Sequence, residues 1–222
     1  MSVRTDTALR TAGGWLAAAS VLMIAVFALH GPLAPDLGAQ MTRIAAAPVK
    51  WRVAHWLAAA SLSSFAVTGL LVLSAASRLT IGGAARSAWA VVSIGALWTL
   101  TTALAEATAV TAAATAGRRE AFEAWWAFAE GKATGFAFVA LAIAVIAWQQ
   151  SRSSDPVTPR WAAGVGAVAG VASFTGWALA RWLGVPVGNH VWVMASMLMS
   201  AWTLWFGVEL SRRRMERTGT VA

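Results

Sequence analysis

Five ionisable side chains are the candidates for chemistry in this sequence, because each lies within or at the edge of a long apolar run. Glu106 interrupts the run LTTALAEATAV, and Glu130 lies in the run that follows. Ionisable residues inside membrane segments are energetically costly and commonly mark a functional site. Imidazole and carboxylate groups are ligands for Zn, Fe, Mn and Cu. The sequence therefore predicts a metal site whose candidate ligands are His30, His55, Glu106, Glu130 and His190.

A haem is the alternative cofactor, because histidines on different helices can ligate its iron from both faces. His190, Met194 and Met197 recur at i, i+4 and i+7, a spacing that places them on one helix face and suits a copper ion or a His/Met haem. The candidate cofactor-binding residues are therefore His30, His55, His190 and Met194. No HxxxH, HExxH or Glu-x-x-His pair accompanies them, so the pattern does not identify the metal or the haem.

The same side chains have structural alternatives. A histidine near a helix end is commonly an interfacial ring that hydrogen-bonds a loop carbonyl, and methionine at helical spacing commonly fills a core. Glu106 and Glu130 are candidates for an ion pair with Lys132 or Arg52. These alternatives need no bound ligand.

Proton-coupled transport of a small solute or ion is a second interpretation, because Glu106 and Glu130 could share one proton if they are crowded together. Apart from Glu209 at the end of the last span, no charged residue falls in the opposite half of the predicted spans, so the sequence indicates no continuous path. A structural or assembly subunit of a membrane complex is a third interpretation. The question of enzymatic activity stays open and no catalytic residue is assigned, because no nucleophile, phosphate-loop or nicotinamide motif occurs.

The elements that must position these residues are membrane-spanning helices. The chain has 222 residues, of which 59% are hydrophobic and 12% are charged, against roughly 25% charged in soluble domains. Six apolar runs are long enough to cross a hydrocarbon core of ~30 Å at ~1.5 Å per residue. We expect an all-α integral membrane protein, a six-helix bundle that forms one domain over residues 1–222. The predicted spans are residues 13–30, 51–76, 87–116, 121–149, 161–182 and 189–210.

The third and fourth spans are each longer than a bilayer requires and are separated by a short turn near Gly117. They are predicted to form an antiparallel hairpin that projects beyond the outer surface. Glu106 lies about eleven residues before this turn and Glu130 about twelve after it, so the two carboxyl groups are expected to face each other. The three histidines are predicted at the same level, near the outer edge of the hydrocarbon.

The net charge of +8 does not indicate nucleic-acid binding, because the basic residues are scattered at the ends of the spans. Their distribution, dominated by arginines in the tail 212–217, predicts cytoplasmic N- and C-termini in a multi-pass protein of the inner membrane. The first span is expected to stay as a signal anchor, since no small-residue cleavage motif follows it. The lack of cysteine excludes covalent c-type haem and Cys-ligated iron–sulfur clusters.

Two local patterns predict further packing. Residues 37–46, between the first two spans, are compatible with a short amphipathic helix. Gly166 and Gly170 form a GxxxG motif with Ala162 on the same helix line, which predicts a close helix contact. Its partner is either another helix of this chain, a second copy, or a partner membrane subunit.

Overall fold

A computed structural model describes residues 3–31, 33–34, 36–75 and 77–212 of the chain. Helices account for nearly all of these residues, and no strand occurs among them. The elements are α1 (Val3–His30), α2 (Leu37–Ala46), α3 (Pro48–Ser74), the 3-10 turn η1 (Arg78–Thr80), α4 (Gly83–Ala105), the π-helix η2 (Glu106–Val110), α5 (Thr111–Thr115), α6 (Arg119–Arg152), α7 (Arg160–Trp177), the π-helix η3 (Ala178–Trp182) and α8 (Val187–Arg212).

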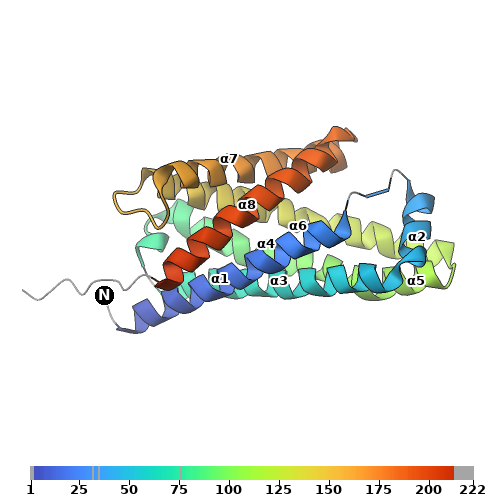
Figure 1. Cartoon of the computed structure of the whole chain (residues 1–222), viewed down its shortest axis with the longest axis horizontal. Coiled ribbons are helices and arrows are strands. Elements are labelled where there is room, and N and C mark those ends of the chain that lie inside the picture. Colours follow the sequence, from blue (N-terminus) through green and yellow to red (C-terminus); the bar gives the residue numbers. More distant parts are fainter. Residues whose placement is uncertain (1–2, 32, 35, 76, 213–222) are drawn as a thin grey trace, which may run out of the picture.

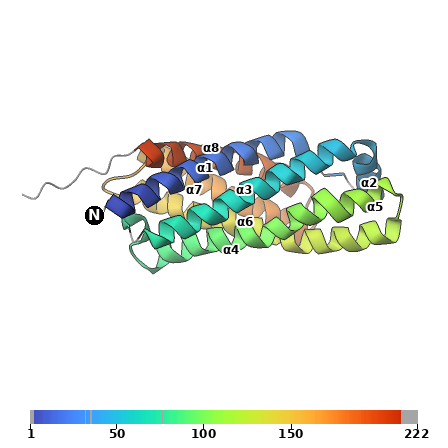
Figure 2. The same cartoon turned by 90° about the horizontal axis from the view of Figure 1, so that it is seen from below.

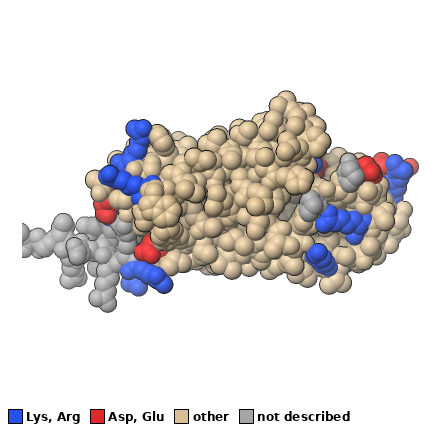
Figure 3. All heavy atoms as spheres, turned by 45° about the horizontal axis from the view of Figure 1, so that its top comes forward, with Lys and Arg blue, Asp and Glu red and all other residues tan. Residues whose placement is uncertain are grey.

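Six helices of the described chain are long and apolar enough to cross a membrane, which confirms the six predicted spans. They are Asp6–His30, Pro48–Ser74, Gly83–Thr115, Arg119–Arg152, Arg160–Trp182 and Val187–Arg212. The first helix begins earlier than predicted, because polar residues before the apolar run continue its backbone hydrogen bonding. Figure 3 shows charged side chains at both ends of the molecule and a broad belt between them without charge, as expected of a protein surrounded by lipid.

The six spans form a closed ring in which each helix packs mainly against two neighbours. The order around the ring is α1, α3, α4, α6, α7, α8 and back to α1, so consecutive spans are adjacent (Figures 1 and 2). Large side chains such as Phe65, Met199 and Phe206 fill the ring towards the end where α1 begins and α8 ends. An up-and-down bundle with short connections satisfies every backbone group within its own helix, as a bilayer requires.

Pairs of glycines allow the helices of the ring to approach closely. A Cβ atom on Gly95 of α4 would lie 2.8 Å from the carbonyl oxygen of Gly135 on α6, and one on Gly135 would lie 2.7 Å from that of Gly95. Gly13 of α1 and Gly207 of α8 meet in the same way, with 2.6 Å from the Gly13 position to the Gly207 oxygen. These contacts bring backbones together, as small residues do in membrane bundles.

The GxxxG motif of α7 packs against other helices of the same chain. A Cβ on Gly166 would lie 2.5 Å from the Trp202 ring of α8, and one on Gly170 would lie 2.6 Å from the Ala140 oxygen of α6. The predicted close contact therefore involves α6 and α8 of the same chain. Because both neighbours already cover these glycines, this face leaves no free surface for a second copy or a partner subunit.

The end of the bundle opposite the start of α1 and the end of α8 is closed by the predicted amphipathic helix, which occurs as α2 with the expected bounds. Asp36 caps its first turn by accepting a hydrogen bond from the Ala39 amide. Ile44 of α2 is fully buried in a small apolar cluster. The other buried members of this cluster are Trp51, Val110, Ala113, Ala114, Phe122 and Trp126.

Gly117, with φ 67°, makes the turn between α5 and α6, and α4 packs along α6. In Figure 1 this tip extends beyond the α7–α8 turn. The first described residues of α1 and the last of α8 lie together at the other end (Figure 1). Which end faces the cytoplasm stays a prediction, and most of the arginine-rich tail 212–217 lies outside the described residues.

Candidate functional site

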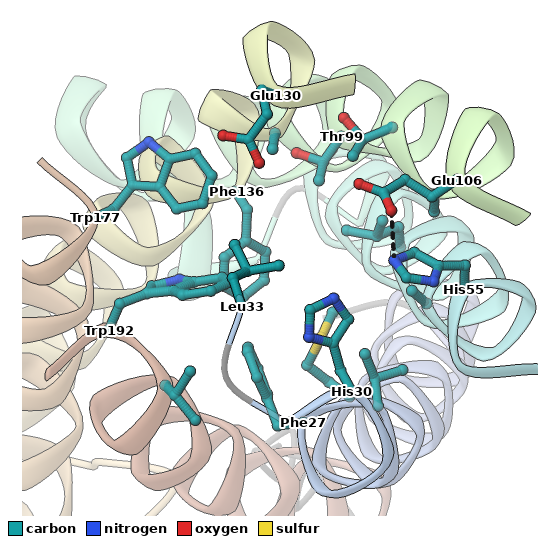
Figure 4. Close-up of a pocket in the computed structure, with 18 of the residues that line it drawn as sticks. Phe27, His30, Leu33, His55, Thr99, Glu106, Glu130, Phe136, Trp177 and Trp192 are labelled. Atoms are coloured by element: carbon teal, nitrogen blue, oxygen red, sulfur yellow. Dashed lines mark ion pairs between the residues drawn. The ribbon is translucent and has the colours of Figure 1, made fainter. Parts of the chain in front are cut away.

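A cavity of ≈ 110 Å³ lies inside the ring towards the α2 end, and every one of the six spans contributes to its wall (Figure 4). On the scale where one water needs ~10–15 Å³, this space admits several waters or a small organic molecule. Most of the wall is aliphatic or aromatic. Its polar lining residues are His30, His55, Thr99, Thr102, Glu106, Glu130 and Arg181, together with the indoles of Trp177 and Trp192.

Among the residues whose burial is described, His55 and Glu106 are the only buried ionisable side chains. They expose 6% and 5% of their surface, respectively. His55 lies one turn after Trp51 on α3, and Glu106 begins the π-helix η2 across from them. The Trp51 indole donates a hydrogen bond to Oε2 of Glu106 at 3.1 Å. The same oxygen lies 3.4 Å from Nε2 of His55.

The hydrogen bonds of His55 imply that it shares one proton with Glu106. Nδ1 of His55 lies 2.9 Å from the Trp51 carbonyl oxygen, which only accepts, so Nδ1 carries a hydrogen. The contact between Nε2 and Oε2 is then favourable only if a second proton lies between them, on either the imidazole or the carboxyl group. In both arrangements the His55–Glu106 pair has no net charge, which suits its burial.

His30, the last residue of α1, stands beside this pair. Its Nδ1 donates to the carbonyl of Gly31 at 2.8 Å, which leaves Nε2 as an acceptor in the neutral ring. The ring centroids of His30 and His55 are 5.2 Å apart in an edge-to-face contact, and both rings lie 4.6 Å from the Trp51 ring. Arg43 of α2 donates to the His30 carbonyl at 2.8 Å and so ties α2 to this corner of the cavity.

The opposite wall is formed by α6, α7 and α8. Glu130 pairs with Arg181 at 3.0 Å, instead of with Lys132 or Arg52 as considered from the sequence. The Arg181 guanidinium lies 5.5 Å from the Trp177 ring, and the rings of Trp177 and Trp192 meet edge to face at 5.1 Å. In Figure 4 the two indoles lie across the cavity from His55 and Glu106.

Three N–H donors of this wall have no acceptor among the described residues: Nε1 of Trp177, Nε1 of Trp192 and Nε of Arg181. The nitrogen atoms are buried, and a buried donor without a partner destabilises a fold by about 1–3 kcal/mol. Unsatisfied buried polar groups of this kind are found at binding or catalytic sites rather than in ordinary cores.

Both π-helices lie at this cavity. Glu106 is the first residue of η2, and Arg181 lies within η3. A π-turn inserts one extra residue into an α-helix, and it therefore changes the direction in which the following side chains point. Each segment carries one of the charged groups that line the cavity.

The structure brings together His30, His55 and Glu106 and adds Glu130 on the far wall. His190 and Met194 do not join them, because both are exposed on α8 and neither lines the cavity. Within the described chain no three His, Asp or Glu side chains are arranged to hold one metal ion. The rings of His30 and His55 are already in contact, so a flat haem could enter between them only if one ring moved.

Sequence reasoning missed the aromatic half of the site. Trp51 and Trp177 are tryptophans of membrane spans, where this residue is common, and nothing in the sequence singles them out. Arg181 lies one residue before the end of the predicted span 161–182. A basic residue at this position is common in membrane helices, so it carries no signal of its own.

Comparison with protein-family models, with curated proteins and with solved structures found no match for this chain. The geometry of the cavity is therefore the basis for assigning a function.

Proposed function

We propose that the protein binds a small, mainly apolar molecule inside its helix ring, at the end that carries α2. The observation that supports this most directly is the convergence of all six spans on one cavity that also contains His55 and Glu106. Enclosed cavities lined by apolar and aromatic side chains, with a few converging polar groups, are the usual form of small-molecule sites. A buried acid in a membrane bundle is most simply explained by a role in such a site.

The lining limits the ligand to a compact shape. Apolar parts of the wall are formed by Phe27, Leu62, Phe136 and Val193, and they separate His55 and Glu106 on one side from Glu130 and Arg181 on the other. A body of about one small ring fits this space, since an apolar cavity of roughly 150 Å³ in another protein accommodates benzene. The shared proton of His55 and Glu106 lies beside such a ligand and is available for exchange with it.

A metal or haem at the same residues has less support, because within the described chain no three His, Asp or Glu side chains are arranged to hold one metal ion. Nδ1 of both His30 and His55 donates to a backbone carbonyl, and Nε2 of His55 faces the Glu106 carboxyl group. Transport through the whole bundle also has less support. In the opposite half of the ring, a void of only ≈ 10 Å³ lies among aromatic side chains that include Phe65, Trp89 and Phe206.

The test uses the full chain in lipid nanodiscs, with toluene, benzylammonium and benzoate as probes that share one ring size. The thermal unfolding temperature and tryptophan fluorescence report binding. The chain has 14 Trp and no Tyr whose emission would overlap with that of tryptophan. Ala133→Phe fills the cavity from α6, and Ala124→Phe adds the same side chain to an exposed site of that helix. We expect at least one probe to raise the unfolding temperature of the wild type and of Ala124→Phe, but not of Ala133→Phe.

Equal responses of the wild type and the filled variant, or no response to any probe, would contradict the proposal. Val193→Phe fills the cavity from α8 and replaces Ala133→Phe if that variant does not fold.

A further inference from the structure

The cavity offers a ligand three acceptor atoms. Oε2 of Glu106 is engaged by Trp51 and His55, but no described residue hydrogen-bonds its other oxygen, Oε1, which points into the cavity in Figure 4. Nε2 of His30 has no hydrogen-bond partner among the described residues and is an acceptor in the neutral ring. A carboxyl oxygen of Glu130 also points towards the cavity in Figure 4.

Three donors of the cavity wall are closed to a ligand. Nε1 of Trp177, Nε1 of Trp192 and Nε of Arg181 are buried atoms, so the two indoles present aromatic faces and edges instead of N–H groups. Phe27 and Phe136 add two more aromatic rings to the lining. Aromatic faces attract a cation by about 0.5–2 kcal/mol each, and they do not attract an anion.

The charge balance of the groups that face the cavity allows one bound cation to replace one proton. The groups are His30 from α1, His55 from α3, Glu106 from η2, Glu130 from α6 and Arg181 from η3, while α8 contributes only Trp192 and Val193. Glu130 and Arg181 neutralise each other at 3.0 Å. The His55–Glu106 pair is neutral with its shared proton and carries one negative charge without it. A bound cation restores neutrality when that proton leaves.

We propose, as an extension of the proposed binding function, that the ligand is a small organic ammonium ion whose charged group contacts Oε1 of Glu106 among the aromatic rings. Its binding displaces the proton that Glu106 shares with His55. The exchange is balanced, since one cation enters the cavity, one proton is released to solvent, and no bond other than that to the proton breaks.

The first experiment compares benzylammonium, toluene and benzoate, which share an aromatic ring and differ in charge. We expect benzylammonium to bind at least tenfold more tightly than toluene at pH 7, and benzoate to bind least. Glu106→Gln should remove the advantage of benzylammonium over toluene, because glutamine keeps the shape of the site without its charge. Glu120→Gln, at an exposed position of α6, is the matched control and should behave as the wild type.

The second experiment measures the proton directly. Because a proton is a product of binding, the benzylammonium dissociation constant should fall about tenfold per unit of rising pH between 6 and 8, where an alkylammonium ion stays charged. Calorimetry in buffers of different ionisation enthalpy should give one proton released per ligand. In Glu106→Gln both the pH dependence and the released proton should vanish.

The outcomes separate this inference from the proposed function. If toluene or benzoate binds in the wild type but not in Ala133→Phe, and benzylammonium does not, the cavity is a binding site and the ammonium proposal is wrong. Benzylammonium binding without proton release would overturn the exchange. If no probe distinguishes the wild type from the filled variants, the binding function itself fails.

Discussion

The two oxygens of the Glu106 carboxyl group have different surroundings. Oε2 accepts from the Trp51 indole and faces Nε2 of His55, and both partners are buried. This side of the residue therefore contributes to the fold, whereas the oxygen that points into the cavity is available to a ligand. Substitutions of Glu106 should separate the two roles.

Replacing Glu106 by Gln should destabilise the protein by only about 1 kcal/mol. With its oxygen in the place of Oε2, the amide still accepts from Trp51, and only the proton shared with Nε2 of His55 is lost. Glu106→Ala should destabilise the protein by about 2–4 kcal/mol, because it leaves Trp51 and His55 without partners and opens a void. Thermal unfolding in detergent micelles measures both. Equal stability of the Ala and Gln variants would show that the Glu106 contacts do not support the fold.

A candidate site residue was predictable from the sequence where the polarity of its side chain differs from that of the neighbouring residues in the chain. Glu106 and His55 are polar groups in apolar runs, and this difference requires no knowledge of the fold. The contributions of Trp51, Trp177 and Arg181 were not predictable, because an aromatic or basic residue near the end of a span is normal in any membrane helix. His190, like His30, lies near the end of a predicted span, but it is exposed in the structure. Its exposure depends on how α8 packs, which the sequence does not show.

The helices themselves were predictable because hydrophobic length is a property of one segment at a time. The six spans and α2 follow from runs of apolar or amphipathic residues. The π-helices η2 and η3 have no comparable signal, since a one-residue insertion changes no composition. The order of helices around the ring was not predicted either, because it depends on which faces fit together.

The crossing of α4 and α6 holds Glu106 and Glu130 on opposite sides of the cavity, and it depends on Gly95 and Gly135. Gly135→Ala should destabilise the protein by roughly 2 kcal/mol or more, because its Cβ would lie 2.7 Å from a backbone oxygen. Gly131→Ala, one turn earlier on α6, has nothing within 4 Å and should be neutral or stabilising by up to about 1 kcal/mol.

Unfolding temperatures of the two glycine variants, measured side by side, test this crossing. A Gly135→Ala protein as stable as Gly131→Ala would mean that α4 and α6 are farther apart than described.

The described chain is a ring of six spans, and an even number of crossings places the start of α1 and the end of α8 on the same side. The S154C and E120C variants test this arrangement, since the chain has no native cysteine and both positions are exposed at opposite ends. We expect an impermeant maleimide to label E120C in intact cells and S154C only after the membrane is opened, as the predicted cytoplasmic termini require. Labelling of both from outside would contradict a membrane-spanning ring.

The contact between Gly13 and Gly207 has a consequence for biosynthesis. Every other neighbour pair in the ring consists of consecutive spans, so each helix can pack against its predecessor soon after it leaves the ribosome. The seam between α1 and α8 has to wait until the last span has been inserted. Ring closure is then the late step of assembly, and the earlier intermediate is an open sheet of helices with its two edges exposed to lipid.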